Sequence, residues 1–382
     1  MNTAASLTPF RTPGEALARH AAERGDAEAM VFPQSATRMT YGDWHERASA
    51  LARALLDMGF VPGDHIGILA ESRIEWPVAQ IAIALMGGVM VPLNTHYRRD
   101  DLKYALSHSG TRCLFLSTAF RNNKYLDMAA SLLDELDSLD TLIIFDDATD
   151  EAFCYAALIG QGRSSDTSLP EVSPDAVASL QYTSGTTGFP KGALLTHAGM
   201  LANAWGISGR LQVTEDDRWT SIIPLFHCAG CIMCVLGTLQ RGSCYVGVPA
   251  FSPVEMFELM QDEKCTMLSG VPTSHIAMLD HPERQNYDLS NLRAGTCGGA
   301  DTDPALLRDC AENFPLPGVV QVYGQTEASV FITLQPDGEV RNDTVGIAAP
   351  GVEIRIDESG EVSAVDLKDL ARRSADDATG IP

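Results

Sequence analysis

Short β-prone runs that alternate with helical stretches constrain the fold of this chain more than any other feature. In the first part of the sequence these runs occupy residues 64–70, 89–93, 111–116 and 141–145. In the second part they occupy residues 176–182, 218–225, 243–248, 265–269, 292–297 and 319–323. Parallel strands need long crossover connections, which are usually helices, so this alternation is typical of parallel sheets covered by helices. The sequence therefore predicts an α/β fold with two helix-covered, mostly parallel sheets.

Two of the predicted helices carry clear start signals. Residues 40–59 open with Thr40 and with Asp43 three positions later, as in a capping box, and they close at Gly59. The apolar residues of this stretch share one helical face, namely Trp44, Ala48, Leu51 and Leu55. Residues 252–263 begin with Ser252 at the N-cap position and Pro253 at the first helical position.

The charge of the chain limits its partners. Lys and Arg total 27 against 50 Asp and Glu, which gives a net charge of -23. This field repels nucleic acid and anionic membrane surfaces, so we expect neither as a partner. It also repels a nucleotide triphosphate, and a site for one therefore needs local donors and a metal ion.

Membrane insertion and secretion are not expected. The longest uncharged stretch, residues 76–93, nearly reaches the length of a membrane span, but Pro77, Gly87, Gly88 and Pro92 interrupt it. We predict a buried helix followed by a strand there. Residues 1–20 lack the continuous apolar core of a secretory signal, so a cytoplasmic location is the expectation.

Nine cysteines in a chain of this kind favour free buried thiols over a disulfide framework. Cys228, Cys231 and Cys234 have a C-x-x-C-x-x-C spacing that is also found in metal and cluster sites. They lie in an apolar run with no nearby histidine or fourth cysteine at ligand spacing, so we interpret them as core residues.

The order of these elements suggests a division into subdomains. The polar residues 161–175 read as a linker between a first α/β subdomain at 1–165 and a second one at 176–340. Residues 341–362 change to short alternating strands with a turn at 358–360, which predicts the start of a small β-barrel subdomain. Residues 363–382 form a polar tail, with one short helix predicted around 366–373.

The strongest chemical signal is YTSGTTGFPKG at residues 182–192, between two β-prone runs. Hydroxyl and backbone donors suited to phosphate oxygens come from Thr183, Ser184, Gly185, Thr186, Thr187 and Gly188. Lys191 adds a positive charge, but the segment lacks the G-K-S or G-K-T ending of a Walker loop. An ordinary surface loop is the alternative, because Gly, Ser and Thr also mark turns.

A second signal, QVYGQTEAS at residues 321–329, follows an apolar strand, where ligands bind in open α/β sheets. Tyr323 can stack on a base, Thr326 can donate to a phosphate, and Glu327 offers the hard oxygen that Mg²⁺ prefers. A lone glutamate on a surface loop is usually solvated, so this segment is weak by itself.

Two further segments are ambiguous on their own. TCGGAD at residues 296–301 follows a predicted strand, and its two glycines permit close backbone approach to a planar ligand or simply a tight turn. His227 follows Phe226 at the opening of an apolar helix, where it can line an organic substrate pocket or fill a structural role.

Taken in this order, the four segments resemble the adenylate-forming superfamily of acyl- and aryl-CoA synthetases, luciferases and nonribosomal peptide adenylation domains. The resemblance covers residues 32–362, and its first motif is highly specific. GVPT at residues 270–273 and AAPGVEIRI at residues 348–356 are similar to the CoA-ligase branch. The resemblance implies the large N-terminal domain of an AMP-forming acid–thiol ligase.

The resemblance also implies a reaction and a set of roles. ATP and Mg²⁺ would activate a small-molecule carboxylic acid as its acyl-adenylate, with CoA or a carrier-protein thiol as the acceptor. Lys191, Thr326 and Glu327 would be catalytic, and Thr183 and Glu327 would bind the metal. The nucleotide would contact Thr183, Ser184, Gly185, Thr186, Thr187, Gly188, Lys191, Gly298, Gly299, Ala300, Gln321, Tyr323, Gly324, Gln325 and Thr326. The acid would contact His227, Val271 and Cys297.

The family pattern stops after Glu361. A Gly-rich barrel segment, a ribose-binding aspartate, a hinge and a mobile domain with a catalytic lysine should follow, and residues 362–382 match none of them. We therefore expect the C-terminal mobile domain to be absent. Three explanations remain open: the truncated product of a damaged gene, a nucleotide- or acyl-binding protein that is no longer a full ligase, and a subunit completed in trans.

Overall fold

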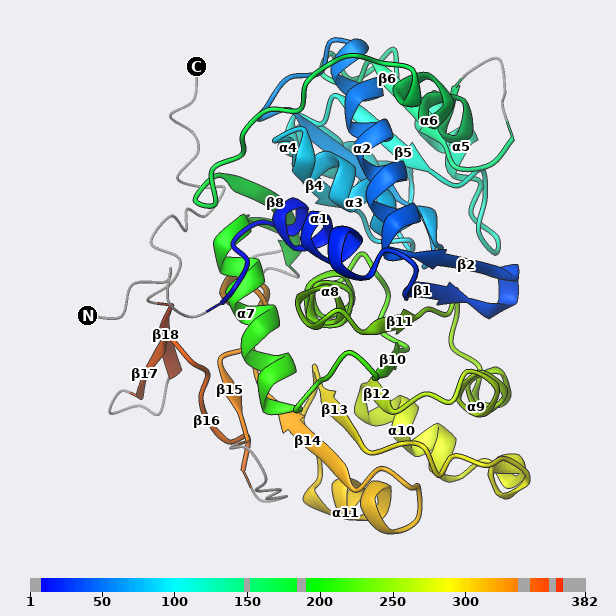
Figure 1. The fold of residues 1–382 in the computed structure, drawn as a ribbon, viewed down its shortest axis with the longest axis vertical. Coiled ribbons are helices and arrows are strands. Elements are labelled where there is room, and N and C mark those ends of the chain that lie inside the picture. Colours follow the sequence, from blue (N-terminus) through cyan, green and yellow to red (C-terminus); the bar gives the residue numbers. More distant parts are fainter. Residues whose placement is uncertain (1–7, 148–151, 184–189, 336–343, 357–361, 367–382) are drawn as a thin grey trace.

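The computed structural model describes residues 8–147, 152–183, 190–335, 344–356 and 362–366. Two seven-stranded sheets with helices on their faces form its body (Figure 1). Every strand pairing within these sheets is parallel except for one hairpin in each, β8–β9 in the first sheet and β1–β2 in the second. The predicted α/β fold with two helix-covered, mostly parallel sheets is confirmed.

The strand orders of the two sheets are β7-β6-β5-β3-β4-β8-β9 and β14-β13-β12-β10-β11-β1-β2. The first sheet contains β3 (His65–Leu69), β4 (Val89–Pro92), β5 (Cys113–Leu116), β6 (Thr141–Ile144), β7 (Phe153–Cys154), β8 (Val177–Thr183) and β9 (Lys191–Thr196). The second contains β1 (Glu28–Phe32), β2 (Thr37–Thr40), β10 (Arg218–Ser221), β11 (Cys244–Val246), β12 (Met267–Gly270), β13 (Ala294–Gly298) and β14 (Gly318–Val322).

Helices connect and cover these strands. The α-helices are α1 (Pro13–Arg24), α2 (Tyr41–Asp57), α3 (Glu75–Leu85), α4 (Arg99–Ser109), α5 (Tyr125–Ala130), α6 (Tyr155–Arg163), α7 (His197–Arg210), α8 (Gly237–Arg241), α9 (Pro253–Asp262), α10 (Pro272–Leu279) and α11 (Pro304–Glu312). A π-helix, η3 (Ala229–Leu236), precedes α8, and short 3₁₀ turns form η2 (Pro33–Ser35), η4 (Pro282–Asn286) and η5 (Thr326–Ala328).

Strand membership crosses the border that the sequence suggested between its two α/β blocks. β8 and β9 lie after the predicted linker yet complete the first sheet, while β1 and β2 come from the N-terminal part and extend the second sheet. The predicted linker is also shorter than expected, because α6 continues to Arg163. Hydrophobic periodicity identifies a strand but not the sheet that it joins, since pairing partners lie far apart in the sequence.

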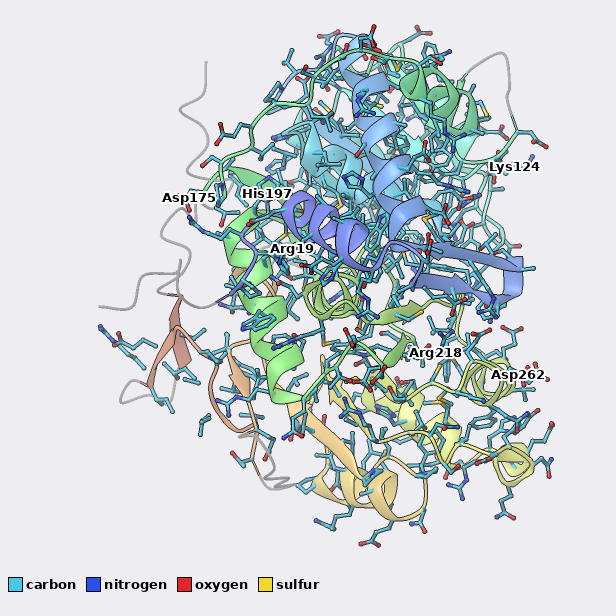
Figure 2. The ribbon with its side chains drawn as sticks, in the orientation of Figure 1. Arg19, Lys124, Asp175, His197, Arg218 and Asp262 are labelled. Carbon is cyan, nitrogen blue, oxygen red and sulfur yellow. The ribbon has the colours of Figure 1, made fainter. Side chains whose placement is uncertain are left out.

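Charged side chains hold the β1–β2 hairpin to the second sheet. Arg218 of β10 donates to Glu28 of β1 at 2.7 Å and to Glu263 at 2.5 Å, and Arg38 of β2 donates to the same two carboxylates. Figure 2 shows Arg218 within the lower layer of the molecule. Glu263 is buried, so these paired hydrogen bonds compensate its desolvation and fix the hairpin in place.

The helix start signals have different outcomes. The capping box of α2 is present, because the Asp43 amide donates to the Thr40 hydroxyl at 3.1 Å and the Thr40 amide donates to the Asp43 carboxylate at 3.3 Å. α9 begins at Pro253 as predicted, but the Ser252 side chain makes no capping hydrogen bond. Pro253 therefore marks the start of α9 without help from a side-chain cap.

The long uncharged stretch at residues 76–93 forms the buried α3 followed by β4, as predicted. Trp76 of α3 is fully buried, as are Trp44 of α2 and Trp219 of β10. Within the described residues, no helix combines the length and the apolarity needed to cross a membrane.

The described part of the C-terminal region contains short antiparallel strand pairs. β15 (Thr333–Leu334) pairs with β16 (Ile347–Ala348), and β17 (Val352–Ile356) pairs with β18 (Val362–Asp366). The strands expected in this region are thus present. The predicted turn at 358–360 and, beyond Asp366, the predicted helix lie outside the described residues.

The contact between α2 and α6 gives a test of the packing. A Cβ atom at Gly162 would lie 1.8 Å from the Ala50 carbonyl oxygen, whereas Gly160 in the same helix has nothing within 4 Å. Gly162→Ala is expected to lower the free energy of unfolding by about 1–3 kcal/mol through overpacking. Gly160→Ala should raise it by about 0.5–1 kcal/mol. Thermal unfolding of both variants measures this contrast, and equal midpoints would contradict the close helix packing.

Candidate active site

A pocket of about 430 Å³ opens at the carboxyl ends of the second sheet's parallel strands. Ile222 and Ile223 follow β10, and Val271 and Gly299 follow β12 and β13. Val322 ends β14. All five line the pocket, which therefore occupies the place where open α/β sheets bind ligands.

Segments that are distant in the sequence meet in this pocket. Thr183 reaches it from the end of β8 in the other sheet, and His227 comes from the β10–η3 connection. The predicted site residues in its lining are Thr183, His227, Val271, Gly298, Gly299, Gly324, Gln325, Thr326 and Glu327. Residues chosen from all four sequence motifs are thus brought together.

Several predicted contacts lie outside the lining. Cys297 points to the opposite face of β13 from Thr296 and Gly298, because side chains alternate along a strand, and its Sγ lies 3.9 Å from the Thr302 hydroxyl. Tyr323 is 41% exposed and is not among the lining residues, and its carbonyl accepts from the Ile332 and Thr333 amides.

Other predicted contacts are Lys191, Ala300 and Gln321, which are likewise not among the lining residues. Ser184, Gly185, Thr186, Thr187 and Gly188 lie outside the described residues.

The end of β8 and the start of β9, on either side of residues 184–189, are anchored to α4. Thr183 pairs with Lys191 across the antiparallel β8–β9 ladder. The Tyr104 hydroxyl donates to the Pro190 carbonyl at 3.1 Å, and the Tyr182 hydroxyl donates to the Ala105 carbonyl at 2.7 Å. The backbone at Thr183 and at the exposed Lys191 is therefore held in place beside the pocket.

Residues 325–329, which include η5, form a compact turn at the pocket wall. The Ala328 amide donates to the Gln325 carbonyl at 3.0 Å, and the Ser329 amide donates to the Thr326 carbonyl at 2.9 Å. Gly324 is required by packing, because a Cβ atom there would lie 1.7 Å from the Val330 carbonyl oxygen. The turn thus presents Thr326 and the exposed Glu327 to the pocket.

His227 lies at the exposed rim of the pocket, two residues before η3 begins. Its Nδ1 atom accepts from the Ala229 amide at 3.3 Å. The protein atoms packed around the ring reduce its hydration and lower the pKa of His227, so the ring is neutral near pH 7. A neutral imidazole can hydrogen-bond a carboxylate without adding a charge.

Apolar side chains that the sequence did not single out form the rest of the wall. Met233 lies one turn along η3 from Ala229, and its sulfur is 3.9 Å from the Thr296 hydroxyl. Ile222, Ile223, Val322 and Phe331 complete this side. Glu327 carries the single formal charge among the described lining residues, so the space away from it suits an uncharged organic group.

The three closely spaced cysteines are core residues, as interpreted from the sequence. Cys231 and Cys234 are fully buried on η3, and Cys228 lines the pocket with its Sγ 3.7 Å from the Thr326 hydroxyl. Burial raises the pKa of Cys228 to about 11, which keeps the thiol protonated. In the described part of the chain, no cluster of three or more His, Cys, Asp or Glu side chains is arranged to hold a metal ion.

The chain belongs to the AMP-binding enzyme family, whose model matches residues 17–366. It is 34% identical over 364 residues to acyl-CoA ligase sidI of Aspergillus fumigatus, covering 90% of this chain and 61% of that protein. It is 33% identical over 370 residues to acyl-CoA ligase SID4 of Ajellomyces capsulatus, covering 92% and 62%. The chain thus spans about three fifths of the length of these two relatives.

A solved structure has the same fold. The anthranilate CoA ligase AuaEII, crystallised in complex with anthranoyl-AMP, superposes with a TM-score of 0.85 at 22% identity, over 95% of this chain and 69% of that one. Together with the family match, this similarity confirms the resemblance to adenylate-forming enzymes that the motifs indicated.

Proposed function

We propose that this chain binds ATP and Mg²⁺ and converts a small-molecule carboxylic acid into its acyl-adenylate, which CoA or a carrier-protein thiol then accepts. The observation that carries the proposal is the meeting of Thr183, the Gly298–Gly299 pair and the Thr326–Glu327 turn around one pocket. These groups supply phosphate donors, close backbone approach and a carboxylate oxygen within a single site.

In the proposed reaction a carboxylate oxygen of the acid attacks the α-phosphorus of ATP. An O–P bond forms, the bond to the β-phosphate oxygen breaks, and pyrophosphate leaves with the electron pair. The hydroxyls of Thr183 and Thr326, both in the pocket lining, would donate to the phosphoryl oxygens. Such catalysis depends on positioning and on neutralising charge that develops on oxygen.

Glu327 and Thr183 are the proposed metal-binding residues. Their carboxylate and hydroxyl oxygens match the hard donors that Mg²⁺ takes beside phosphates, and both side chains line the pocket. When bound there, the ion would neutralise phosphate charge. Two protein ligands are sufficient, because Mg²⁺ commonly completes its octahedron with water and phosphate oxygens.

The acid is proposed to lie against the apolar wall. Neutral His227 stands at the rim, where its ring can hydrogen-bond the carboxylate. Met233 and Phe331 of the pocket wall are buried and apolar, so they exclude water from their part of the pocket. A dry wall protects an acyl-adenylate, which water would otherwise hydrolyse.

Pyrophosphate release tests the proposed function. The chain is incubated with ATP, Mg²⁺ and a panel of aliphatic, aromatic, dicarboxylic and amino acids. Acid-dependent release, together with formation of the corresponding acyl-adenylate, is the expected result. ATP binding without release by any acid would favour a nucleotide-binding role instead.

Lys191→Ala is expected to slow this release by about tenfold, the factor that corresponds to roughly 1.4 kcal/mol. The moderate effect is expected because Lys191 is exposed and solvent weakens its field. Lys124→Ala is the matched control, since Lys124 is also exposed and lies at the right edge of the upper layer in Figure 2, away from His197, which directly follows β9. Equal rates for the two variants would remove Lys191 from the proposed site.

A further inference from the structure

Asn203, in the middle of α7, connects that helix to the chain directly after Glu327. The side chain is 4% exposed. Its Nδ2 atom donates to the carbonyls of Ala328 and Phe331, both at 3.1 Å. Its Oδ1 atom accepts from the Phe331 amide at 3.3 Å. One buried amide thereby binds three backbone groups at both ends of residues 328–331.

The segment that Asn203 binds has an unfavourable backbone conformation. Ser329 has a φ of 59° and Val330 a φ of 124°. The second value is exceptional, because a β-branched residue clashes with its own backbone at positive φ. Conformations of this kind persist only when the surrounding structure holds them, and they concentrate at functional sites. The hydrogen bonds from Asn203 span both residues and supply such support.

The strained segment is part of the pocket. Val330 and Phe331 line it, and the Val330 carbonyl packs against Gly324. A change in the path of residues 328–331 would therefore move the preceding turn that carries Thr326 and Glu327. In sites that hold reacting groups, a displacement of about 1 Å can cost about a hundredfold in rate.

α7 is also fixed to the strand that carries Lys191. β9 ends at Thr196, whose hydroxyl accepts from the Gly199 amide at 3.1 Å and so caps α7. β8 and β9 also contact η5. Asn203 therefore joins the two parts of the proposed nucleotide site through one rigid helix.

We infer that Asn203 is a positioning residue that sets the place of Glu327, and with it the affinity for Mg²⁺ and ATP, relative to the Thr183–Lys191 strand pair. This inference rests on the proposed function of the pocket. Only an amide of this size offers two donated hydrogens and one acceptor here, because aspartate lacks the donors and leucine lacks all three.

The test compares Asn203→Asp and Asn203→Leu with Gln240→Leu. Gln240 of α8 is a buried amide like Asn203, and neither it nor its partner Leu201 is among the pocket-lining residues. Its Nε2 atom donates to the Leu201 carbonyl of α7 at 3.0 Å. Three quantities are measured for each variant: the Mg²⁺ concentration that half-saturates ATP binding, kcat/KM for pyrophosphate release, and hydrogen exchange at residues 324–333.

Both Asn203 variants are expected to raise the half-saturating Mg²⁺ concentration by about fivefold, the factor for a lost hydrogen bond. They should lower kcat/KM by about ten- to a hundredfold and speed exchange at residues 324–333. Gln240→Leu should lower the thermal midpoint to a similar extent and leave these three quantities unchanged.

Two results would overturn the inference. One is an Asn203 variant that loses stability as Gln240→Leu does but keeps the Mg²⁺ dependence and the exchange pattern of the wild type. The other is faster exchange with unchanged Mg²⁺ dependence, which would make Asn203 a structural residue only. Failure of the wild type to bind ATP is a different result: it would reject the proposed function, while hydrogen exchange would still report on the contact.

Discussion

Glu327→Gln is expected to slow pyrophosphate release by about 10²- to 10³-fold, as loss of a charge-stabilising group does in comparable sites. The substitution keeps the size of the side chain and its place in the η5 turn. It removes the single formal charge among the described lining residues, and a neutral amide is a much weaker ligand for Mg²⁺ than a carboxylate. The rate is measured with saturating acid while the Mg²⁺ concentration is varied.

The dependence on Mg²⁺ separates this role from a general disturbance of the fold. A lost metal ligand shifts the Mg²⁺ titration to higher concentrations, whereas partial unfolding lowers the amplitude at every concentration. Glu312→Gln at the end of α11 is the control, because Glu312 is exposed and lies outside the pocket lining. An unchanged Mg²⁺ titration for Glu327→Gln would exclude Glu327 as the metal-binding residue.

The local elements could be predicted because their signals are local. Thr40 and Asp43 form the capping box that the spacing indicated, and the glycines at 87 and 88 separate α3 from β4. The pairing of strands within each sheet could not be predicted in this way. β1 joins β11 although more than two hundred residues separate them, and alternation of apolar residues contains no information on such partners.

The candidate site was predictable to the extent that its residues lie in short motifs. Thr183, Thr326 and Glu327 could be singled out because they belong to short segments of glycine, hydroxyl and carboxylate residues that come at or soon after the end of a predicted strand. Cys297 was chosen from the same motif as Gly298, but strand alternation turns its side chain away from the pocket. The rule that neighbours in a strand face opposite sides was available from the sequence and would have favoured Thr296.

Asn203 shows what motif reasoning leaves out. Its partners are backbone groups 125 and 128 residues away, so no spacing pattern marks it. The available signal was weak: an asparagine in the middle of an apolar helix is unfavourable there unless its amide finds partners. A buried polar residue of this kind can be noticed in a sequence, but its partners require the structure.

Each sheet contains strands from both parts of the sequence, and this arrangement explains why the pocket forms where it does. Because β8 and β9 belong to the first sheet, the segment after Thr183 starts from one layer while Thr326 and Glu327 extend from the other. α7 leads from β9 back toward the second sheet, where Asn203 meets residues 328–331. The proposed nucleotide site is therefore assembled between two layers, and it depends on how firmly they are joined.

Lowering the pH from about 6.5 to 4 is expected to destabilise the fold by about 3 kcal/mol through His197 alone. His197 begins α7 (Figure 2), is fully buried, and its ring nitrogens have no hydrogen-bond partner among the described residues. Burial lowers the pKa of His197 to about 4, whereas an unfolded histidine has a pKa of about 6.5. Between these values the unfolded chain binds a proton that the folded chain does not, so stability falls as the pH falls.

The measurement is the free energy of unfolding of the wild type and of His197→Leu, by denaturant titration at several pH values from 7.5 to 4. Other histidines, including the half-buried His65 and the buried His275, also have a lowered pKa, so the variant should keep part of the slope. The wild type should nevertheless lose more stability than His197→Leu over this range, and His96→Gln, which alters an exposed ring, should follow the wild type. Parallel curves for the wild type and His197→Leu would mean that His197 is not held neutral by burial.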